Sequence, residues 1–388
     1  MSISTDRSTY LRWLLPASSF RLPVAVLPLA IEYVIGTSAN FRFASLVVGA
    51  LAVGELSVVG IVTTPLGVPV ARLRTRSTLA LLALADVVLV LASLLHPLLW
   101  VSLPGALFSG ALTALGSGKL RQTLTQRLQS RSLQRYLSWD AVALEFAYLV
   151  APLLISLQVV LLGSRGLLVT PAILAIASPL LLGRDATSVA PPSGTGHVSL
   201  RSWLWVLSAT EGLVEGMVVV SIVPIAADLI HQPPFAALAM ALLSIGSILG
   251  GTLYSHLGTR SASIRPLRRI AVLLVGLSGS LIASALGDHS ALLLGGLLFV
   301  FGSFIAPING LRSYAASHRF AAHLHGAAFS MVYASYSVGS LSAAVVFAIL
   351  DQTIPLTDLP VIAAATAMGV ALLYLSLDHY RTASNAVD

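Results

Sequence analysis

Ionisable side chains inside long apolar stretches are the residues of this sequence best suited to chemistry. A charged residue in such a position is costly in a membrane and generally faces the interior of a helix bundle, so each one marks a candidate functional site. A carboxyl group there can bind a proton or a cation. Glu211 and Glu215 share one face of a helix because they are four residues apart. The residues of this kind are Arg21, Glu32, Glu55, Asp86, Glu145, Glu211 and Glu215.

The composition indicates what kind of element must hold these side chains. Only 10% of the residues are charged and 56% are hydrophobic, and the mean hydropathy is +0.90. An ordinary soluble domain has about 25% charged residues. A soluble enzyme of this size is therefore excluded, as is a disordered or fibrous chain, and the sequence predicts an integral membrane protein.

Several reaction classes lack the residues that they need. The sequence has no cysteine, which excludes disulfides, a thiolate nucleophile and a cysteine metal site. It has no glycine-rich phosphate loop followed by lysine, so this chain alone is not an ATP-driven transporter. Hydrolase and metalloprotease motifs do not occur either. We therefore expect no enzyme activity, no metal site and no cofactor.

The apolar stretches are long enough to cross a bilayer as helices, which takes about 20 residues each. They predict an all-α protein with twelve transmembrane helices. The predicted spans are 13–38, 44–70, 78–95, 98–118, 137–162, 167–182, 203–230, 235–257, 270–287, 290–311, 326–350 and 359–379.

The distribution of basic residues predicts the sidedness, because cytoplasmic loops are enriched in Lys and Arg. With both termini inside, 19 of the 22 basic residues fall on the cytoplasmic side, whereas Arg42 and Arg165 fall outside and Arg21 lies within the first span. This pattern predicts a multi-pass protein of the cytoplasmic membrane. Because the arginines are spread over separate short loops, they favour contact with anionic lipids, and we expect no nucleic-acid partner.

A segment rich in Pro, Gly and Ser divides the chain into two parts. It predicts a six-helix half at 1–182, a cytoplasmic linker at 183–202 and a second six-helix half at 203–388.

The two halves show a weak internal repeat. Aligning Gly67 with Gly251 also matches the Thr-Arg-Ser sequences that follow them. The same alignment places Glu32 within one residue of Glu215. Paired six-helix halves are a known plan of secondary transporters, with the binding site between them near the middle of the membrane.

With this plan and one degenerate motif, the chain resembles the major facilitator superfamily over nearly its whole length. That family has G-x-x-x-D-R-x-G-R-R/K in the loop after span two. Here Ala71 replaces the acid of the first copy, and Ser255 replaces it in the second. The loss of both acids puts in doubt the charge relay that this motif forms in the family. The residues that match are Gly67, Arg72 and Arg76 in the first copy, and Gly251, Gly258 and Arg260 in the second.

Span five gives a second comparison. Exporters of the family often have G-x-x-x-G-P-x-x-G-G there, and this chain has Ala147, Ala151 and Pro152 at the first, second and proline positions. The similarity slightly favours proton-coupled export. A proline kink with ordinary packing of small residues explains the pattern equally well.

The resemblance implies roles for particular residues, because spans one, four, seven and ten line the central cavity in the family. It makes Glu32, Glu211 and Glu215 candidates for proton coupling, or for binding a cationic substrate. Asn309 at the end of span ten is a further candidate, although such a residue more often joins helices. The family fold brings spans one and five close together, which favours a structural ion pair between Arg21 and Glu145.

We therefore predict a secondary transporter that works by alternating access as a monomer. Its partners are a small-molecule substrate, protons and membrane lipids. Proton-coupled export of an amphipathic compound is the first prediction, and proton-coupled import of a small metabolite is the second. A non-transporting sensor or assembly protein with the same fold is the alternative from another class.

Overall fold

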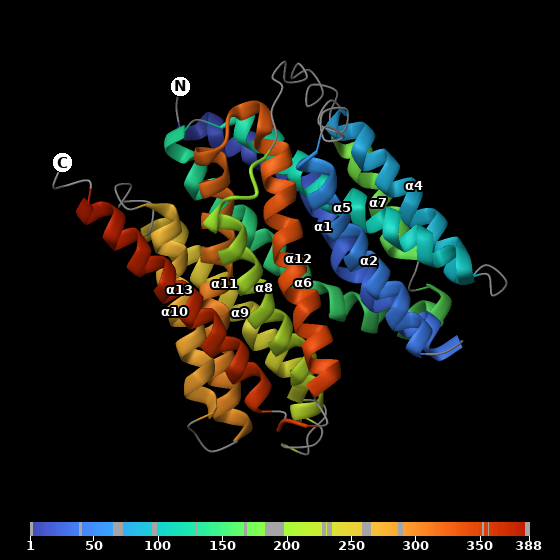
Figure 1. The fold of residues 1–388 in the computed structure, drawn as a ribbon. Helices are drawn as coiled ribbons and strands as arrows, with labels where there is room; N and C mark the ends of the chain where they lie inside the picture. The colour runs from blue at the N-terminus through green and yellow to red at the C-terminus, as the bar shows by residue number, and fades with distance from the viewer. Residues whose placement is uncertain are drawn as a thin grey trace. The chain divides into compact units, whose positions relative to one another are not determined.

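The structure is a computed structural model (Figure 1). It describes residues 3–38, 41–64, 73–94, 99–128, 130–166, 169–182, 198–226, 230, 235–257, 265–285, 290–350, 353–355 and 357–384.

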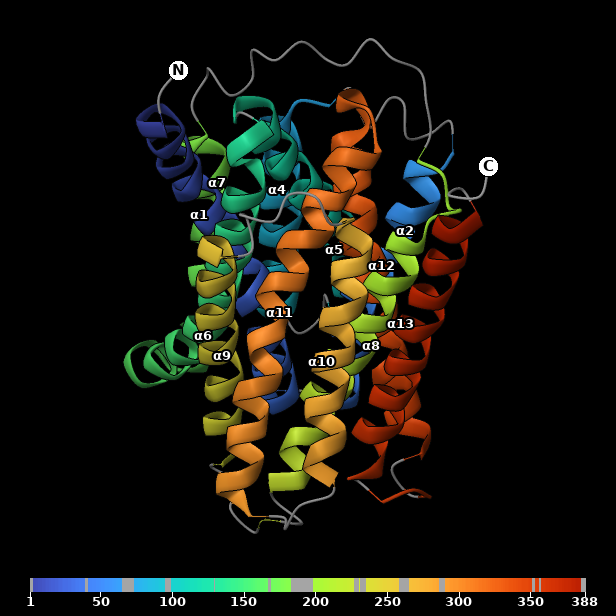
Figure 2. The same ribbon diagram turned by 90° about the vertical axis from the view of Figure 1, so that its left-hand side faces the viewer.

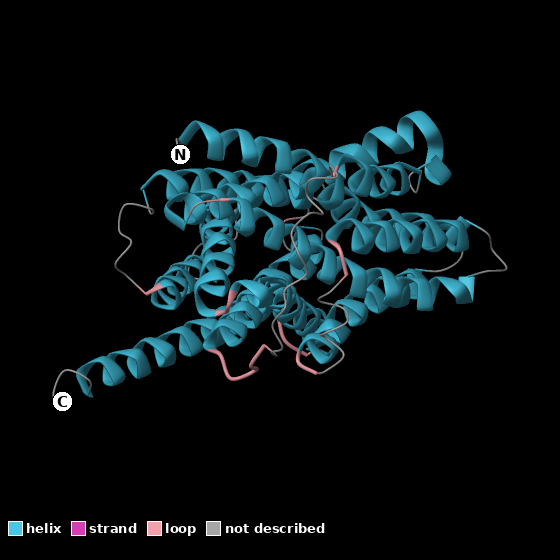
Figure 3. Ribbon diagram, turned by 90° about the horizontal axis from the view of Figure 1, so that it is seen from above, coloured by secondary structure: helices cyan, strands magenta, loops and turns pink. Residues whose placement is uncertain are grey.

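Within these residues all regular structure is helical, as the view coloured by secondary structure shows (Figure 3). The α-helices of the first half of the sequence are α1 (Ile3–Ser38), α2 (Phe41–Val62), α4 (Thr75–Leu94), α5 (Leu99–Arg127), α6 (Ser130–Gly166) and α7 (Val169–Leu181). Those of the second half are α8 (Trp203–Pro224), α9 (Phe235–Leu257), α10 (Pro266–Ala285), α11 (Ala291–Arg319), α12 (His325–Leu350) and α13 (Asp358–Ser384). A short 3-10 helix, Ala322–Leu324, precedes α12.

Each of the twelve predicted spans coincides with one of these helices, but several helices are longer than predicted. α5 continues to Arg127, α6 begins at Ser130, and α11 continues to Arg319. The extra turns are polar, so a search for apolar residues ends before the helix does. Among the described residues, eight helices are long and apolar enough to cross a membrane. The chain is thus a multi-pass membrane protein, while the count of twelve spans stays a prediction.

The chain folds into two compact units, which we name the first and the second unit. The first comprises Met1–Leu133, Phe146–Leu200 and Ala316–Ala334, and the second comprises Gln134–Glu145, Arg201–Ala315 and Ser335–Asp388. In the second unit α10 packs along α13 (Figure 2). The predicted division at the linker 183–202 stays a prediction, since both units take residues from either side of it.

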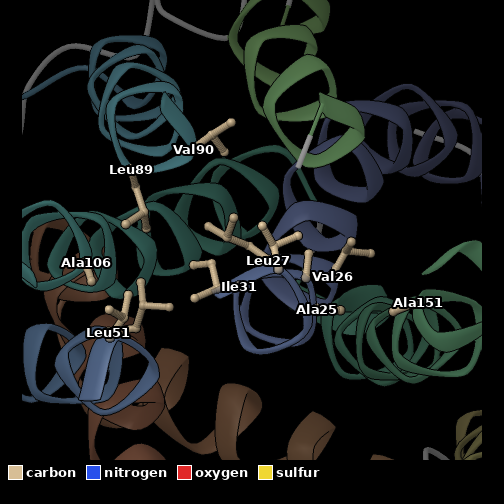
Figure 4. Packing of buried hydrophobic residues seen from close by; sticks show 12 residues of the cluster. Ala25, Val26, Leu27, Ile31, Leu51, Leu89, Val90, Ala106 and Ala151 are labelled. Carbon is tan, nitrogen blue, oxygen red and sulfur yellow. The ribbon is translucent and has the colours of Figure 1, made fainter. Parts of the chain in front are cut away.

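The core of the first unit is built around α1. Leu27 and Ile31 of this helix lie at the centre of an apolar cluster and are 4% and 0% exposed (Figure 4). Side chains from four other helices surround them. The cluster includes Leu51 of α2, Leu89 and Val90 of α4, Ala106 of α5 and Ala151 of α6 (Figure 4).

Glycines allow α2 and α5 to approach closely within the first unit. A Cβ atom on Gly54 would overlap the carbonyl oxygen of Leu107, and one on Gly110 would overlap that of Leu51. Such small-residue contacts are typical of helix pairs in membranes, where van der Waals packing replaces the hydrophobic effect.

The second unit repeats this pairing with α9 and α11. A Cβ atom on Gly246 would overlap the carbonyl oxygen of Phe299, and one on Gly302 would overlap that of Leu243. These four positions stand at one constant offset in residue number from their counterparts in α2 and α5. The buried contacts therefore establish an internal repeat, which pairs Gly54 with Gly246, Leu107 with Phe299, Gly110 with Gly302 and Leu51 with Leu243.

This repeat has a different offset from the alignment of Gly67 with Gly251, and Gly67 lies outside the described residues. At the offset that pairs Gly54 with Gly246, Glu32 corresponds to Pro224 and not to Glu215. The alignment of the Thr-Arg-Ser sequences and the pairing of Glu32 with Glu215 stay predictions, because loop lengths vary between repeats.

Candidate functional site

A buried ion pair lies in the interior of the second unit. The Nη1 atom of Arg312 on α11 lies 2.7 Å from Oε2 of Glu211 on α8, and the two side chains are 4% and 0% exposed. Ion pairs hidden this completely depend on further polar contacts to offset the loss of hydration. Arg312 has two such contacts, one with Asn309 and one with Tyr336.

Asn309 and Tyr336 hold the guanidinium group of Arg312 in place. Nη2 of Arg312 donates a hydrogen bond to Oδ1 of Asn309, one helical turn earlier on α11. The guanidinium carbon also lies 5.1 Å from the centre of the Tyr336 ring on α12, a cation–π contact. Arg312 is therefore fixed by three helices, α8, α11 and α12.

Glu215 lies one turn after Glu211 on the same face of α8. The hydroxyl group of Tyr336 donates a hydrogen bond to its carboxylate. The other oxygen, Oε2, is buried and has no hydrogen-bond partner among the described residues. Oε1 of Glu211 is in the same situation. Two carboxyl oxygens of α8 are thus hidden from water without a donor, although such atoms are normally paired.

Glu145 of α6 brings a third carboxyl group to this place and is 3% exposed. Its Oε1 accepts a hydrogen bond from Nδ2 of Asn309 at 3.5 Å. Ser247 of α9 donates a second hydrogen bond to the carboxylate. We call Glu145, Glu211, Glu215, Asn309, Arg312 and Tyr336 the acid cluster.

Small residues set the geometry of the acid cluster by bringing α8 and α12 together. A Cβ atom on Gly212 would overlap the carbonyl oxygen of Tyr336, and one on Gly339 would overlap that of Ala209. The two helices therefore touch at their backbones, which places Tyr336 beside the acids of α8. Upstream, the hydroxyl oxygen of Ser202 caps α8 by accepting a hydrogen bond from the N–H of Leu204 at 3.2 Å.

The acid cluster has more acids than it can neutralise by itself. It contains three carboxyl groups, Glu145, Glu211 and Glu215, and one guanidinium group, that of Arg312. A buried carboxylate without a counter-charge is strongly disfavoured, so such a group takes up a proton or a cation. The arrangement can thus bind and release a small positive species.

The structure brings together three of the four predicted coupling residues, Glu211, Glu215 and Asn309. The fourth, Glu32, lies on α1, and its side chain lies outside the described residues. Their roles in coupling stay predictions, because a geometry alone does not test transport.

The central role of Arg312 in the acid cluster was not predicted from the sequence. The pattern of basic residues places it among the cytoplasmic loop arginines, because the predicted span ends at residue 311. One signal was available: Arg312 follows Asn309 by three residues, and therefore shares its helical face if the helix continues.

The predicted partners Arg21 and Glu145 have different surroundings. The guanidinium carbon of Arg21 lies 5.4 Å from the centre of the Trp13 ring in the first unit. Glu145 contacts Asn309 and Ser247 in the second unit. The ion pair between them stays a prediction, and the contacts of Glu145 favour a different role.

Most of the inner-loop motif lies outside the described residues, namely Gly67, Arg72, Gly258 and Arg260. Arg76 lies in the first turn of α4 and is half-buried. Gly251 is buried, and a Cβ atom there would meet Val142 and Ala306. Its role is therefore close packing of α6 and α11 against α9.

Two acids of the first unit each accept a hydrogen bond from a neutral hydroxyl group. The hydroxyl group of Ser109 on α5 donates a hydrogen bond of 2.5 Å to the buried Asp86 of α4. The hydroxyl group of Tyr333 donates one of 3.2 Å to Glu55 of α2. Neither contact brings two acids together, so the first unit has no equivalent of the acid cluster among these residues.

No protein-family model and no curated protein matches the sequence. Solved structures match it over nearly its full length. A bacterial homologue of the iron transporter ferroportin, outward-facing with soaked iron, is 17% identical with a TM-score of 0.71, covering 97% of this chain and 100% of that one. The proton:xylose symporter XylE, a member of the major facilitator superfamily, is 13% identical with a TM-score of 0.72, covering 97% and 96%.

The human organic anion transporter MFSD10 is a third similar structure, 14% identical with a TM-score of 0.66, covering 95% of this chain and 97% of that one. All three of these proteins are described as transporters. The chain has the fold of the major facilitator superfamily.

Proposed function

We propose that this chain is a proton-coupled secondary transporter, which moves a small molecule across the cytoplasmic membrane by alternating access. The acid cluster is the observation that supports the proposal. Its three carboxyl groups share one guanidinium group in the interior of the second unit. Acids held inside a membrane protein in this way are typical of proton relays in transporters.

A proton fits the acid cluster better than a bulky substrate does. Glu211 is 0% exposed and Arg312 is 3% exposed, so neither presents a surface to a large ligand. A proton needs no such surface, and one proton would neutralise a carboxyl group that has no counter-charge. Glu215 is the least buried of the three acids as a whole residue, and we propose it as the first site of protonation.

The direction of transport is part of the proposal. The small residues around Pro152 in α6 favour export of an amphipathic compound. Import by proton symport is the second candidate, and the proton:xylose symporter with this fold supports it. We further propose that the chain works as a monomer of two six-helix halves.

Proton flux in proteoliposomes tests the function. Purified protein is reconstituted with a pH-sensitive dye inside, and drugs, sugars and amino acids are added one class at a time. We expect one class to start a proton flux. Glu215→Gln should abolish this flux while the protein still inserts normally. Glu55→Gln is the matched control, because it neutralises an acid of the first unit that lies outside the acid cluster.

Two outcomes would contradict the proposal. Substrate-driven flux that persists in Glu215→Gln would remove this residue from coupling. Silence across the whole panel would favour a carrier without proton coupling, or the non-transporting alternative with the same fold, and substrate binding would then separate these two.

A further inference from the structure

One segment of α6 belongs to the second unit although the rest of the helix does not. α6 is continuous from Ser130 to Gly166. Its residues Gln134–Glu145 fall in the second unit, and those from Phe146 onward fall in the first. We call Gln134–Glu145 the docked segment. Because the helix is continuous, movement of the docked segment is passed on to the remainder of α6.

Small and apolar residues make several contacts of the docked segment, which also contains the buried Asp140. Ala141 and Val142 pack against Ala306 of α11. Ser138 lies against Gly310, where a Cβ atom would come within 2.9 Å of the Ser138 Cα atom. Near its start, Gln134 donates a hydrogen bond of 3.3 Å to the hydroxyl group of Tyr254 on α9. None of these contacts involves Glu145.

Glu145 is the last residue of the docked segment, and its surroundings are charged, unlike those of the residues above. It faces Glu211 and Glu215 of α8 and Arg312 of α11, with the neutral Asn309 and Ser247 completing its surroundings. Arg312 is already paired with Glu211 at 2.7 Å. Ionised Glu145 therefore adds a negative charge to a buried site whose guanidinium group is already engaged, whereas neutral Glu145 adds none.

We propose that protonation of Glu145 controls whether the docked segment of α6 stays on the second unit. Protonated Glu145 permits docking, because its neutral carboxyl group tolerates the nearby acids. Ionised Glu145 is repelled by Glu211 and Glu215, and it gains hydration when the segment detaches. This inference rests on the proposed function, since it states how proton binding at the acid cluster moves a helix.

The internal repeat supplies a matched control position. At the offset established by the glycine contacts, Ser330 of α12 corresponds to Ser138, and Gly118, which Ser330 contacts, corresponds to Gly310. Both serine hydroxyl groups donate a hydrogen bond of 3.0 Å to the carbonyl oxygen four residues earlier. Ser138 and Ser330 are 0% and 1% exposed. Near Ser330, the hydroxyl group of Tyr333 donates a hydrogen bond to Glu55. This contact does not bring one acid next to two others, as happens at Glu145.

Thiol labelling measures the docking directly, because the chain has no cysteine of its own. Ser138→Cys and Ser330→Cys are each introduced alone, and alkylation by N-ethylmaleimide is timed between pH 6 and pH 8 in the full-length protein. The ratio of the two rates cancels the ordinary effect of pH on thiol reactivity. We expect this ratio to rise with pH, by up to about tenfold per pH unit for one linked proton.

Glu145→Gln removes the charge and keeps one amide oxygen that can accept the hydrogen bond from Asn309. In this background we expect Ser138→Cys to stay protected, with a pH-independent ratio. A ratio that is constant with pH in the parent overturns the inference, even if Glu145→Gln fails to fold. A pH-dependent ratio that survives Glu145→Gln also overturns it, because the pH dependence would then come from a group other than Glu145. Proton flux with a constant labelling ratio would leave the proposed function standing while this inference fails.

Discussion

At the scale of single residues, Arg312 is the group on which the acid cluster depends. It is paired with Glu211 and held by Asn309 and Tyr336, all within the second unit. Arg312→Ala leaves Glu211 buried without its counter-charge. We expect this change to lower the free energy of unfolding by about 3 kcal/mol or more. Thermal unfolding of the purified protein in detergent measures the loss.

A double variant separates the charge from the packing. Glu211→Leu together with Arg312→Leu removes both charges and should be more stable than Arg312→Ala, because no unpaired charge stays buried. If the single and double variants have the same melting temperature, the charges of the ion pair contribute nothing to stability beyond the packing of the two side chains.

The sequence predicted the acids of the cluster but not its cation. Glu211 and Glu215 lie in a long, mostly apolar stretch, where a charged residue is easily recognised as unusual. Arg312 follows a stretch that ends in polar residues, and basic residues at such ends normally mark the cytoplasmic side. The sequence places Glu145 within a predicted span, but the residues that it contacts come from helices distant in sequence, which periodicity cannot identify.

At the scale of helices, glycine contacts determine which helices can approach each other. Gly339 of α12 has no room for a Cβ atom, which would overlap the carbonyl oxygen of Ala209 on α8. Gly296 of α11 has no atom within 4 Å of that position among the described residues. Gly339→Ala should cost about 1–3 kcal/mol through overpacking, and Gly296→Ala should be neutral or slightly stabilising. Melting temperatures of the two variants test this difference.

Equal melting temperatures would contradict the close approach of α8 and α12. Glycine patterns of this kind are visible in the sequence, yet they do not reveal their partners. Gly246 and Gly250 on α9 are spaced like Gly212 and Gly216 on α8, but the first pair packs on α11 and the second on α12. The helices themselves were predictable from hydropathy, whereas their pairing required the structure.

At the scale of the whole molecule, the repeat preserves the packing of helices but not the ionisable residues of the acid cluster. At the offset that pairs Gly54 with Gly246, the counterparts of Glu211, Glu215 and Arg312 in the first unit are Ser19, Pro23 and Leu120. None of them is ionisable, so at these described positions the first unit keeps the helix packing and lacks a counterpart of the acid cluster.

The predicted sidedness of the molecule can be tested at the two ends of α13. Thr353 precedes this helix and Ser384 is its last residue. Because basic residues predict a cytoplasmic C-terminus, Thr353→Cys should lie outside and Ser384→Cys inside. Intact cells treated with a membrane-impermeant maleimide should label the first variant only. Both should be labelled after the membrane is opened, since the chain has no other cysteine. Labelling of Ser384→Cys in intact cells would reverse the predicted orientation, and it would place the arginine-rich loops on the outer face.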